Sequence, residues 1–260
     1  DDFGFMDPEP ANLALPLTWI PHEQDPSASS QVWMIGEGMG PWNGRLLHLS
    51  YNSGRLFVVT PDFEAPKSQG SVIPLDLRTD LPLLHGRMHP RGDAVYLAGF
   101  QVWGTRATTH SSLARLRPGS TPVTTAVSAR SVKDGVILEF ASPLDPDSLR
   151  PESVNVRLWN YQRSSAYGSG RFNREGGEGT TPWGIAQTIP SRDGKSVFIH
   201  LPDLPPAMQV EVRHDFRLAG GVPARGAAFL TVHEPHAVNL TAAGFPAIDM
   251  TKPALAVVQE

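Results

Sequence analysis

The sequence predicts an all-β protein built from two consecutive antiparallel units, and three observations lead to this fold class. The 260 residues include 25 prolines and 24 glycines, well above the average share of these two types. Helices do not tolerate so many breakers, which excludes a long bundle or coiled coil. Hydrophobic residues still make up 40% of the chain, so a substantial core is expected. Short apolar runs alternate with Gly, Pro and Asn turns, as in antiparallel sheets.

The first unit is expected over residues 14–118, after an acidic, Pro-bearing extended arm at residues 1–13. Its clearest feature is a hairpin, in which residues 45–51 alternate with period two, residues 52–54 turn and residues 55–60 return. Other expected elements are a strand at 31–35, a Gly-rich turn at 36–44, and strands at 94–100 and 112–117. This rhythm is typical of propeller blades, and about two propeller-like blades fit.

The second unit is expected over residues 119–236. About six short strands are predicted, at residues 124–131, 136–140, 154–159, 197–201, 208–212 and 229–232. Strands at this spacing, with one apolar face, suit an Ig-like or fibronectin-type β-sandwich. A polar Gly/Ser-rich insertion at residues 164–184 is too long for a simple hairpin loop. Residues 237–260 form a tail of low charge without periodicity.

Charge and cysteine usage exclude several classes of function. The net charge of -4 argues against a surface for nucleic acid or anionic membranes. The chain has no cysteine, which excludes disulfides, Cys-ligated zinc, iron–sulfur clusters and covalently attached c-type haem within it. No apolar run approaches the ~20 residues of a membrane span. The first residues lack both signal-peptide features and an initiator methionine, so we expect a processed chain or a fragment.

Histidine is the residue type that points most directly to a metal or cofactor site. His85, Arg87, Met88 and His89 gather at a turn before a strand, where imidazole and thioether groups suit a metal or a haem iron. The alternative is an ordinary turn in which Arg87 pairs with an acid. His48 alternates with apolar neighbours, and we interpret it as a hydrogen-bonded structural histidine.

A second pair of histidines, His233 and His236, follows the end of a predicted strand and brackets Glu234. Two imidazoles and a carboxylate could ligate a metal, although the spacing matches no standard zinc motif and Pro235 excludes a helix there. The alternative is a last strand that meets a polar loop. The sequence shows no nucleophile elbow, P-loop, dinucleotide-binding glycine fingerprint or EF-hand.

Aromatic side chains form two further candidate groups. Trp103 and Arg106 follow the strand at residues 94–100, where they could stack on a sugar or quinone ring or simply close one blade against the next. The second group lies in and beside the insertion and consists of Trp159, Asn160, Tyr161, Tyr167 and Trp183. Flat rings beside amide and hydroxyl groups suit a saccharide. They equally suit a long loop that covers a sheet.

One short stretch carries a fold signature. Residues 136–145 supply a strand ending in Phe140 and a Pro-Leu-Asp corner, and residues 147–156 continue into the next strand. This pattern resembles the bacterial Ig-like repeat, in which the phenylalanine enters the core. A short helical turn capped by Asp147 or Ser148 is expected after the corner.

A longer match extends over about residues 15–235. It rests on residues 15–21, 29–33, 40–51, 69–70, 86–99, 159–161, 167–169, 193–198 and 202–209. Together these resemble the C-terminal half of secreted bacterial glucose/sorbosone dehydrogenase-like propeller proteins of planctomycete and verrucomicrobial type, which are often fused to cytochrome c. The resemblance implies a propeller end followed by an Ig-like domain, a periplasmic or secreted location, and redox chemistry on a sugar or similar alcohol. Pyrroloquinoline quinone or haem would be the electron acceptor.

Three functional hypotheses follow. In the first, the chain is a piece or subunit of an extracytoplasmic oxidoreductase that acts only with a partner chain. It completes the propeller and adds rim residues to a cofactor site held largely by that partner, because two blades cannot enclose a cofactor and no Cys-x-x-Cys-His is present. In the second, it is a non-catalytic secreted β module that binds carbohydrate or a protein through residues 159–184. In the third, it is a small metal or haem carrier.

Overall fold

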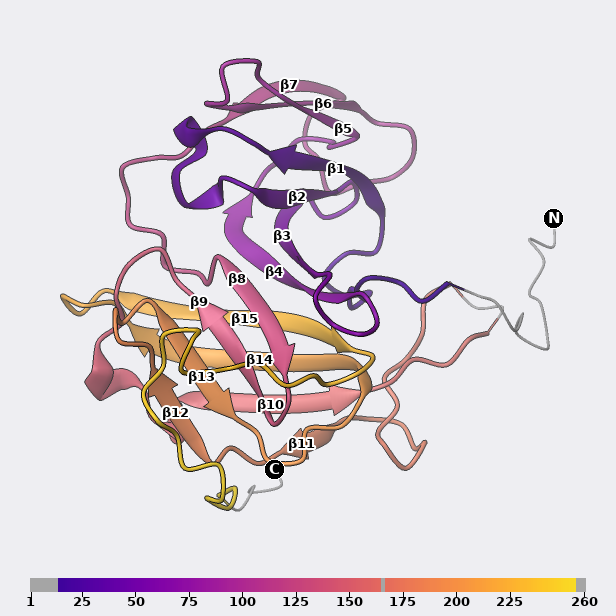
Figure 1. The fold of residues 1–260 in the computed structure, drawn as a ribbon. Helices are drawn as coiled ribbons and strands as arrows, with labels where there is room; N and C mark the ends of the chain where they lie inside the picture. Colours follow the sequence, from indigo (N-terminus) through magenta and orange to yellow (C-terminus); the bar gives the residue numbers. More distant parts are fainter. Residues whose placement is uncertain (1–13, 165–166, 256–260) are drawn as a thin grey trace.

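The computed structural model describes residues 14–164 and 167–255. It is 42% strand and 5% helix, and all of its strand pairings are antiparallel. Over these residues no sheet closes on itself. The all-β prediction is confirmed, with sheets packed face to face (Figure 1). No helix within the described ranges has the length and apolar character needed to cross a membrane.

A long eight-stranded sheet runs through the molecule in the order β1-β2-β3-β4-β15-β14-β10-β11. Its strands are β1 (Ala28–Met34), β2 (Arg45–Ser50), β3 (Arg55–Asp62), β4 (Gln69–Arg78), β15 (Pro223–Val232), β14 (Ala207–Arg217), β10 (Val154–Trp159) and β11 (Thr181–Trp183). The two predicted units therefore share one sheet, because β4 from the first pairs with β15 from the second.

Two smaller sheets pack on the same face of the long sheet (Figure 1). One has the order β5-β6-β7 and the other the order β12-β13-β9-β8. Their strands are β5 (His85–Met88), β6 (Val95–Phe100), β7 (Ser111–Leu116), β8 (Ser128–Val132), β9 (Gly135–Glu139), β12 (Gln187–Pro190) and β13 (Ser196–His200). Burial of the alternate apolar residues of both layers stabilises each pair of sheets.

Irregular segments cover the remaining faces. Residues 14–27 lie over the other face of the long sheet, where Leu17 and Ile20 pack against Phe57 and Phe229. After β15 the chain crosses the outer face of the four-stranded sheet, where Phe245 contacts Phe198. Apolar side chains in segments without regular structure thus complete the core.

The predicted hairpin of the first unit is confirmed. Strands β2 and β3 pair antiparallel, with His48 opposite Phe57. Gly54 has a φ of 63°, a conformation that costs glycine little. A Cβ there would also collide with the carbonyl oxygen of Thr79, so we expect any other residue at this position to disrupt the turn.

The helical segments among the described residues are short 3₁₀ turns, η1 (Glu37–Trp42), η2 (Pro146–Ser148) and η3 (Pro151–Ser153). The first lies within the predicted Gly-rich turn. The prediction that Asp147 or Ser148 caps the turn after the Pro-Leu-Asp corner was wrong. Asp145 caps it, and its carboxylate accepts a hydrogen bond of 3.1 Å from the Asp147 amide, because Pro146 takes the first helical position.

Candidate functional site

The long sheet splits between β4 and β15. These strands pair only where Gly70, Ser71 and Val72 face Thr231, Leu230 and Phe229. In this register Thr231–Gly70 and Phe229–Val72 are the hydrogen-bonded pairs. The next hydrogen-bonded pair would join Ala227 to Pro74. Proline has no N–H to donate to the ladder, so the hydrogen bonding ends there. Beyond this point β4 continues to Arg78 and β15 back to Pro223 without pairing with each other.

A cleft of about 780 Å³ opens where the strands diverge, a volume in the usual range for ligand sites. We call it the split-sheet groove. Its polar lining is Gln24, Arg55, Asp76, Thr125, Arg213, His214, Asp215 and Arg225, and its apolar lining includes Pro74, Ala227 and Phe229. The residues come from four strands, from the N-terminal segment and from the segment before β8, so the groove exists only in the folded chain.

Two of the arginines that line the groove form ion pairs. Arg225 Nε donates to Asp215 Oδ1 at 2.8 Å, and this hydrogen bond, followed by the carboxylate charge, raises the pKa of Arg225. Arg213 Nη2 lies 2.5 Å from Oε1 of the buried Glu211, an ion pair without good hydrogen-bond alignment. The side chains of Arg213 and Arg225 remain 58% and 70% exposed, so their guanidinium groups can still reach a ligand.

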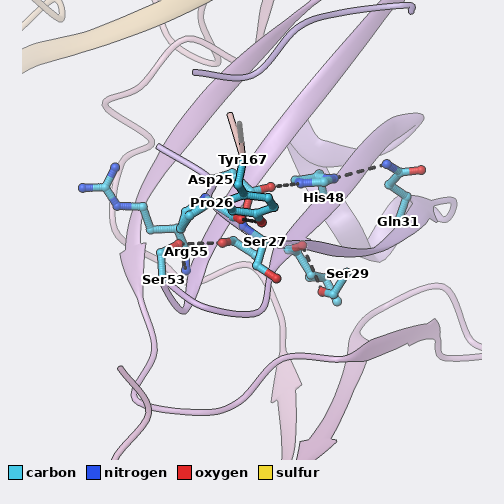
Figure 2. Close-up of polar contacts among 11 residues, drawn as sticks. Asp25, Pro26, Ser27, Ser29, Gln31, His48, Ser53, Arg55 and Tyr167 are labelled. Carbon is cyan, nitrogen blue, oxygen red and sulfur yellow. Dashed lines mark hydrogen bonds and ion pairs between the residues drawn. The ribbon is translucent and has the colours of Figure 1, made fainter. Parts of the chain in front are cut away.

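A buried hydrogen-bond network of Asp25, His48 and Gln31 fixes the N-terminal segment beside the groove (Figure 2). The His48 ring lies between Asp25 and Gln31, with Nε2 2.6 Å from Asp25 Oδ2 and Nδ1 3.2 Å from Gln31 Nε2. His48 donates through Nε2 and accepts at Nδ1 from the amide of Gln31 in this arrangement. The side chains of His48 and Asp25 are only 2% and 1% exposed.

Residues adjacent to this hydrogen-bond network connect it to the groove. Gln24, next to Asp25, accepts a hydrogen bond from Arg55. The Tyr167 hydroxyl donates to the Pro26 carbonyl (Figure 2). Both ring nitrogens of His48 are engaged and neither contacts a hydroxyl or thiol group, so this arrangement suits an anchor better than a reaction centre. The prediction that His48 is hydrogen-bonded is confirmed, and its structural role stays a prediction.

His214 also lines the groove, although its side chain lies on the opposite face of β14 from Arg213 and Asp215. Its ring stacks on Phe216 at 5.1 Å, and Nδ1 is 3.0 Å from the Ala224 carbonyl oxygen. Burial lowers the pKa of His214 to about 4. A neutral imidazole, hydrogen-bonded to the Ala224 carbonyl, therefore supports the β14–β15 pair at neutral pH.

This histidine predicts a loss of stability in acid. Because its pKa is lower in the folded chain than in the unfolded chain, the unfolded chain binds more protons between pH 6.5 and 4. The stabilisation is complete above pH 6.5, and on the order of 3 kcal/mol is lost as the pH falls to 4. Urea unfolding across this range should show the loss, and H214Q should flatten the pH dependence. An unchanged slope in H214Q would contradict this assignment.

The histidine-rich cofactor candidates lie on and beside β5. His85 and Arg87 are exposed on the outer face of the β5–β6–β7 sheet, and His85 Nδ1 is 3.4 Å from Ser30 Oγ. Met88 packs toward the core beneath this sheet. His89 Nδ1 is 3.0 Å from an Asp93 carboxylate oxygen across the turn.

The other two cofactor candidates lie in the loop after β6. The Trp103 ring contacts Tyr51 at a centroid distance of 4.6 Å, and the Arg106 amide donates to the Asn52 carbonyl at 3.2 Å. Both residues thus hold the loop against the 52–54 turn. The structure divides the six candidates between this loop and β5, and their cofactor role stays a prediction.

The predicted saccharide group is also divided. Trp159 is fully buried beneath the Arg171 guanidinium, 4.4 Å from its ring centroid. Beside it, burial raises the pKa of Tyr161, and the Glu211 charge adds to the rise. Asn160 Oδ1 accepts a hydrogen bond of 2.9 Å from the Met208 amide. These three residues join the insertion to the sheet.

Tyr167 and Trp183 lie apart from those three. Tyr167 is 81% exposed, with its ring against His22 at 5.2 Å. Trp183 packs against the core between the long and four-stranded sheets, and its indole N–H donates to the Pro202 carbonyl. Of the five, Tyr167 therefore offers the most exposed ring.

The two candidate metal ligands also have other contacts. His233 Nε2 is 2.8 Å from the Pro16 carbonyl oxygen, and His236 Nε2 is 3.8 Å from Asp62 Oδ2. Within residues 14–164 and 167–255, no group of three His, Asp or Glu side chains is arranged to hold a metal ion. The metal assignment at His233 and His236 stays a prediction.

Sequence reasoning missed the residues of the split-sheet groove. A local signal existed, since polar residues alternate with apolar ones at positions 211, 213, 215 and 217. This alternation predicts a strand with one charged face. No family model, curated protein or solved structure matches the chain, so its function is inferred from this geometry.

Proposed function

We propose that the chain is a non-catalytic binding module that holds an extended, acidic segment of a protein partner in the split-sheet groove. The observation that carries the proposal is the set of three arginines, Arg55, Arg213 and Arg225, around a cleft of about 780 Å³. Guanidinium groups bind carboxylates in bidentate fashion. A cleft between diverging strands suits an extended chain.

The lining favours a peptide over a saccharide. Saccharides stack on exposed aromatic rings, but the aromatic residue of the groove is Phe229, which is buried in its floor. Exposed charges at the rim and small apolar groups below suit acidic and apolar side chains that alternate along a peptide. The sequence left carbohydrate and protein open as ligands of residues 159–184. We propose a protein ligand instead, and we place it at the groove.

A phage-displayed library of random heptapeptides tests this proposal. The full chain should enrich peptides rich in Asp and Glu, and R213A/R225A should reduce their binding at least tenfold. The matched control R150A/R192A removes two exposed arginines outside the groove and should bind as the unsubstituted chain does.

Two results would overturn the proposal. One is enrichment of acidic peptides that is the same in R213A/R225A. The other is the absence of peptide enrichment together with arginine-dependent binding of anionic oligosaccharides, which would assign a saccharide to the groove.

The exposed face of the β5–β6–β7 sheet favours a second candidate function. Tyr96, Phe100 and Leu113 are 37%, 59% and 78% exposed, on the same side as His85 and Arg87. Such a face suits a partner chain of an extracytoplasmic redox protein that carries haem or pyrroloquinoline quinone. In this proposal β1–β4 and β5–β7 are two propeller-like blades, and the two sheets around β8–β15 are an Ig-like sandwich.

Native material distinguishes the two functions. A haem or quinone absorbance band that co-purifies with a larger chain, and is lost in a Leu113→Asp variant, supports the redox assembly. Colourless, metal-free protein without a partner would overturn it and leave the groove proposal untouched.

A further inference from the structure

The edge of β15 that faces the groove carries unpaired backbone groups. In the β14–β15 hairpin the Leu218 amide donates to the Val222 carbonyl at 2.8 Å, which sets the alternation of the ladder. Every second pair from this one is hydrogen-bonded, which includes Phe216–Ala224 and His214–Gly226. Ala224 and Gly226 therefore direct their backbone N–H and C=O groups toward β14. Arg225 and Ala227 must direct theirs away from β14, into the groove.

Nothing in the described chain pairs with this edge at those two positions. The pairing between β15 and β4 covers Phe229, Leu230 and Thr231 only, and Pro74 blocks its extension. Arg225 and Ala227 therefore present two N–H donors and two carbonyl acceptors to the groove. Open strand edges of this kind accept an added strand from another chain.

We propose that the partner segment binds by strand addition, as a β-strand hydrogen-bonded to Arg225 and Ala227 of β15. This inference rests on the proposed function and specifies how the groove holds its ligand. Four extended residues span about 13 Å and are enough to meet both positions. The added strand pairs with the part of β15 that β4 leaves unpaired beyond Pro74.

The side chains along this edge specify the partner. Arg225 and Ala227 point to the same face as Asp215 and Arg213. A residue opposite Arg225 meets its exposed guanidinium and is acidic. A residue opposite Ala227 lies over a methyl group, beside Phe229 and Pro74, where a large apolar side chain fits. The partner therefore has an acidic and a large apolar residue two positions apart, because alternate residues of a strand share a face.

Amide hydrogen exchange on the full chain, with a heptapeptide selected from the library, tests strand addition. Bound peptide should slow exchange of the Arg225 and Ala227 amides at least tenfold. The variant Ala227→Pro removes one donor on the groove side without touching the β14 ladder, and should weaken binding at least tenfold. N-methylation of the peptide amides that face β15 gives the same test without altering the protein, and methylation of the alternate amides is the matched control.

The outcomes separate this inference from the proposed function. Peptide binding that needs Arg213 and Arg225, with no protection of the two amides and full tolerance of N-methylation, overturns strand addition alone. Absence of peptide binding at the groove overturns both. Protection of the same amides without peptide, accompanied by concentration-dependent dimerisation, would replace the partner by a second copy of this chain.

Discussion

Replacement of Asp25 or His48 by alanine is expected to lower the free energy of unfolding by about 3–5 kcal/mol. The side chains are 1% and 2% exposed and lie 2.6 Å apart. Removal of one partner leaves the other buried without its main contact, and an unpaired buried polar group is costly. Urea unfolding of D25A and H48A, followed by circular dichroism, measures the loss.

The Asp25–His48 interaction can be separated from simple side-chain loss. Q31A removes only the 3.2 Å contact to His48 Nδ1 and should cost about 1 kcal/mol. A D25L/H48L double variant replaces both polar groups with apolar ones and should be more stable than either alanine variant. Losses below 1 kcal/mol in both D25A and H48A would show that water reaches the Asp25–His48 pair. The pair would then not anchor residues 21–27.

This anchor has a consequence for the groove. Gln24, adjacent to Asp25, forms part of the groove lining and contacts Arg55. Loss of the Asp25–His48 contact should therefore loosen one rim, and peptide binding by D25A should weaken more than binding by Q31A.

Trp159→Ala is expected to cost about 3–5 kcal/mol of unfolding free energy. Trp159 is fully buried, and it packs with Phe57, Val59 and Phe229 in the core under the N-terminal segment. The substitution leaves a cavity there and frees Arg171, which now lies over the ring. Urea unfolding measures this loss as well.

Tyr167→Ala is the matched comparison for Trp159. Tyr167 belongs to the same predicted saccharide group but is 81% exposed, so its loss should change stability little beyond its contacts with Pro26 and His22. Similar losses in both variants would contradict the structural role of Trp159. Saccharide binding that is lost in Tyr167→Ala would instead support the predicted saccharide site in the insertion.

Local patterns predicted the strands that alternate clearly or end in strong turns. The hairpin of β2 and β3 has both signals and is confirmed. Strand β4 was missed because Pro74 interrupts its apolar run. Strands β14 and β15 are longer than predicted, because the prediction followed apolar runs and stopped where exposed charged residues such as Arg213, Asp215 and Arg225 begin.

The candidate site was not predictable from local patterns. Its arginines come from β3, β14 and β15, and no spacing in the sequence indicates that these strands meet. The aromatic cluster at residues 159–161 was visible in the sequence, but its burial depends on the N-terminal segment and on Arg171.

The sequence by itself determined an all-β chain, because proline and glycine content, turn residues and period-two alternation act through the local backbone. It also determined that no cysteine chemistry takes place within the chain. The tertiary structure alone decided that the two predicted units share a sheet and that this sheet splits at Pro74. That decision depends on the register between β4 and β15, which are far apart in the chain and meet only when two hydrophobic cores pack against one long sheet.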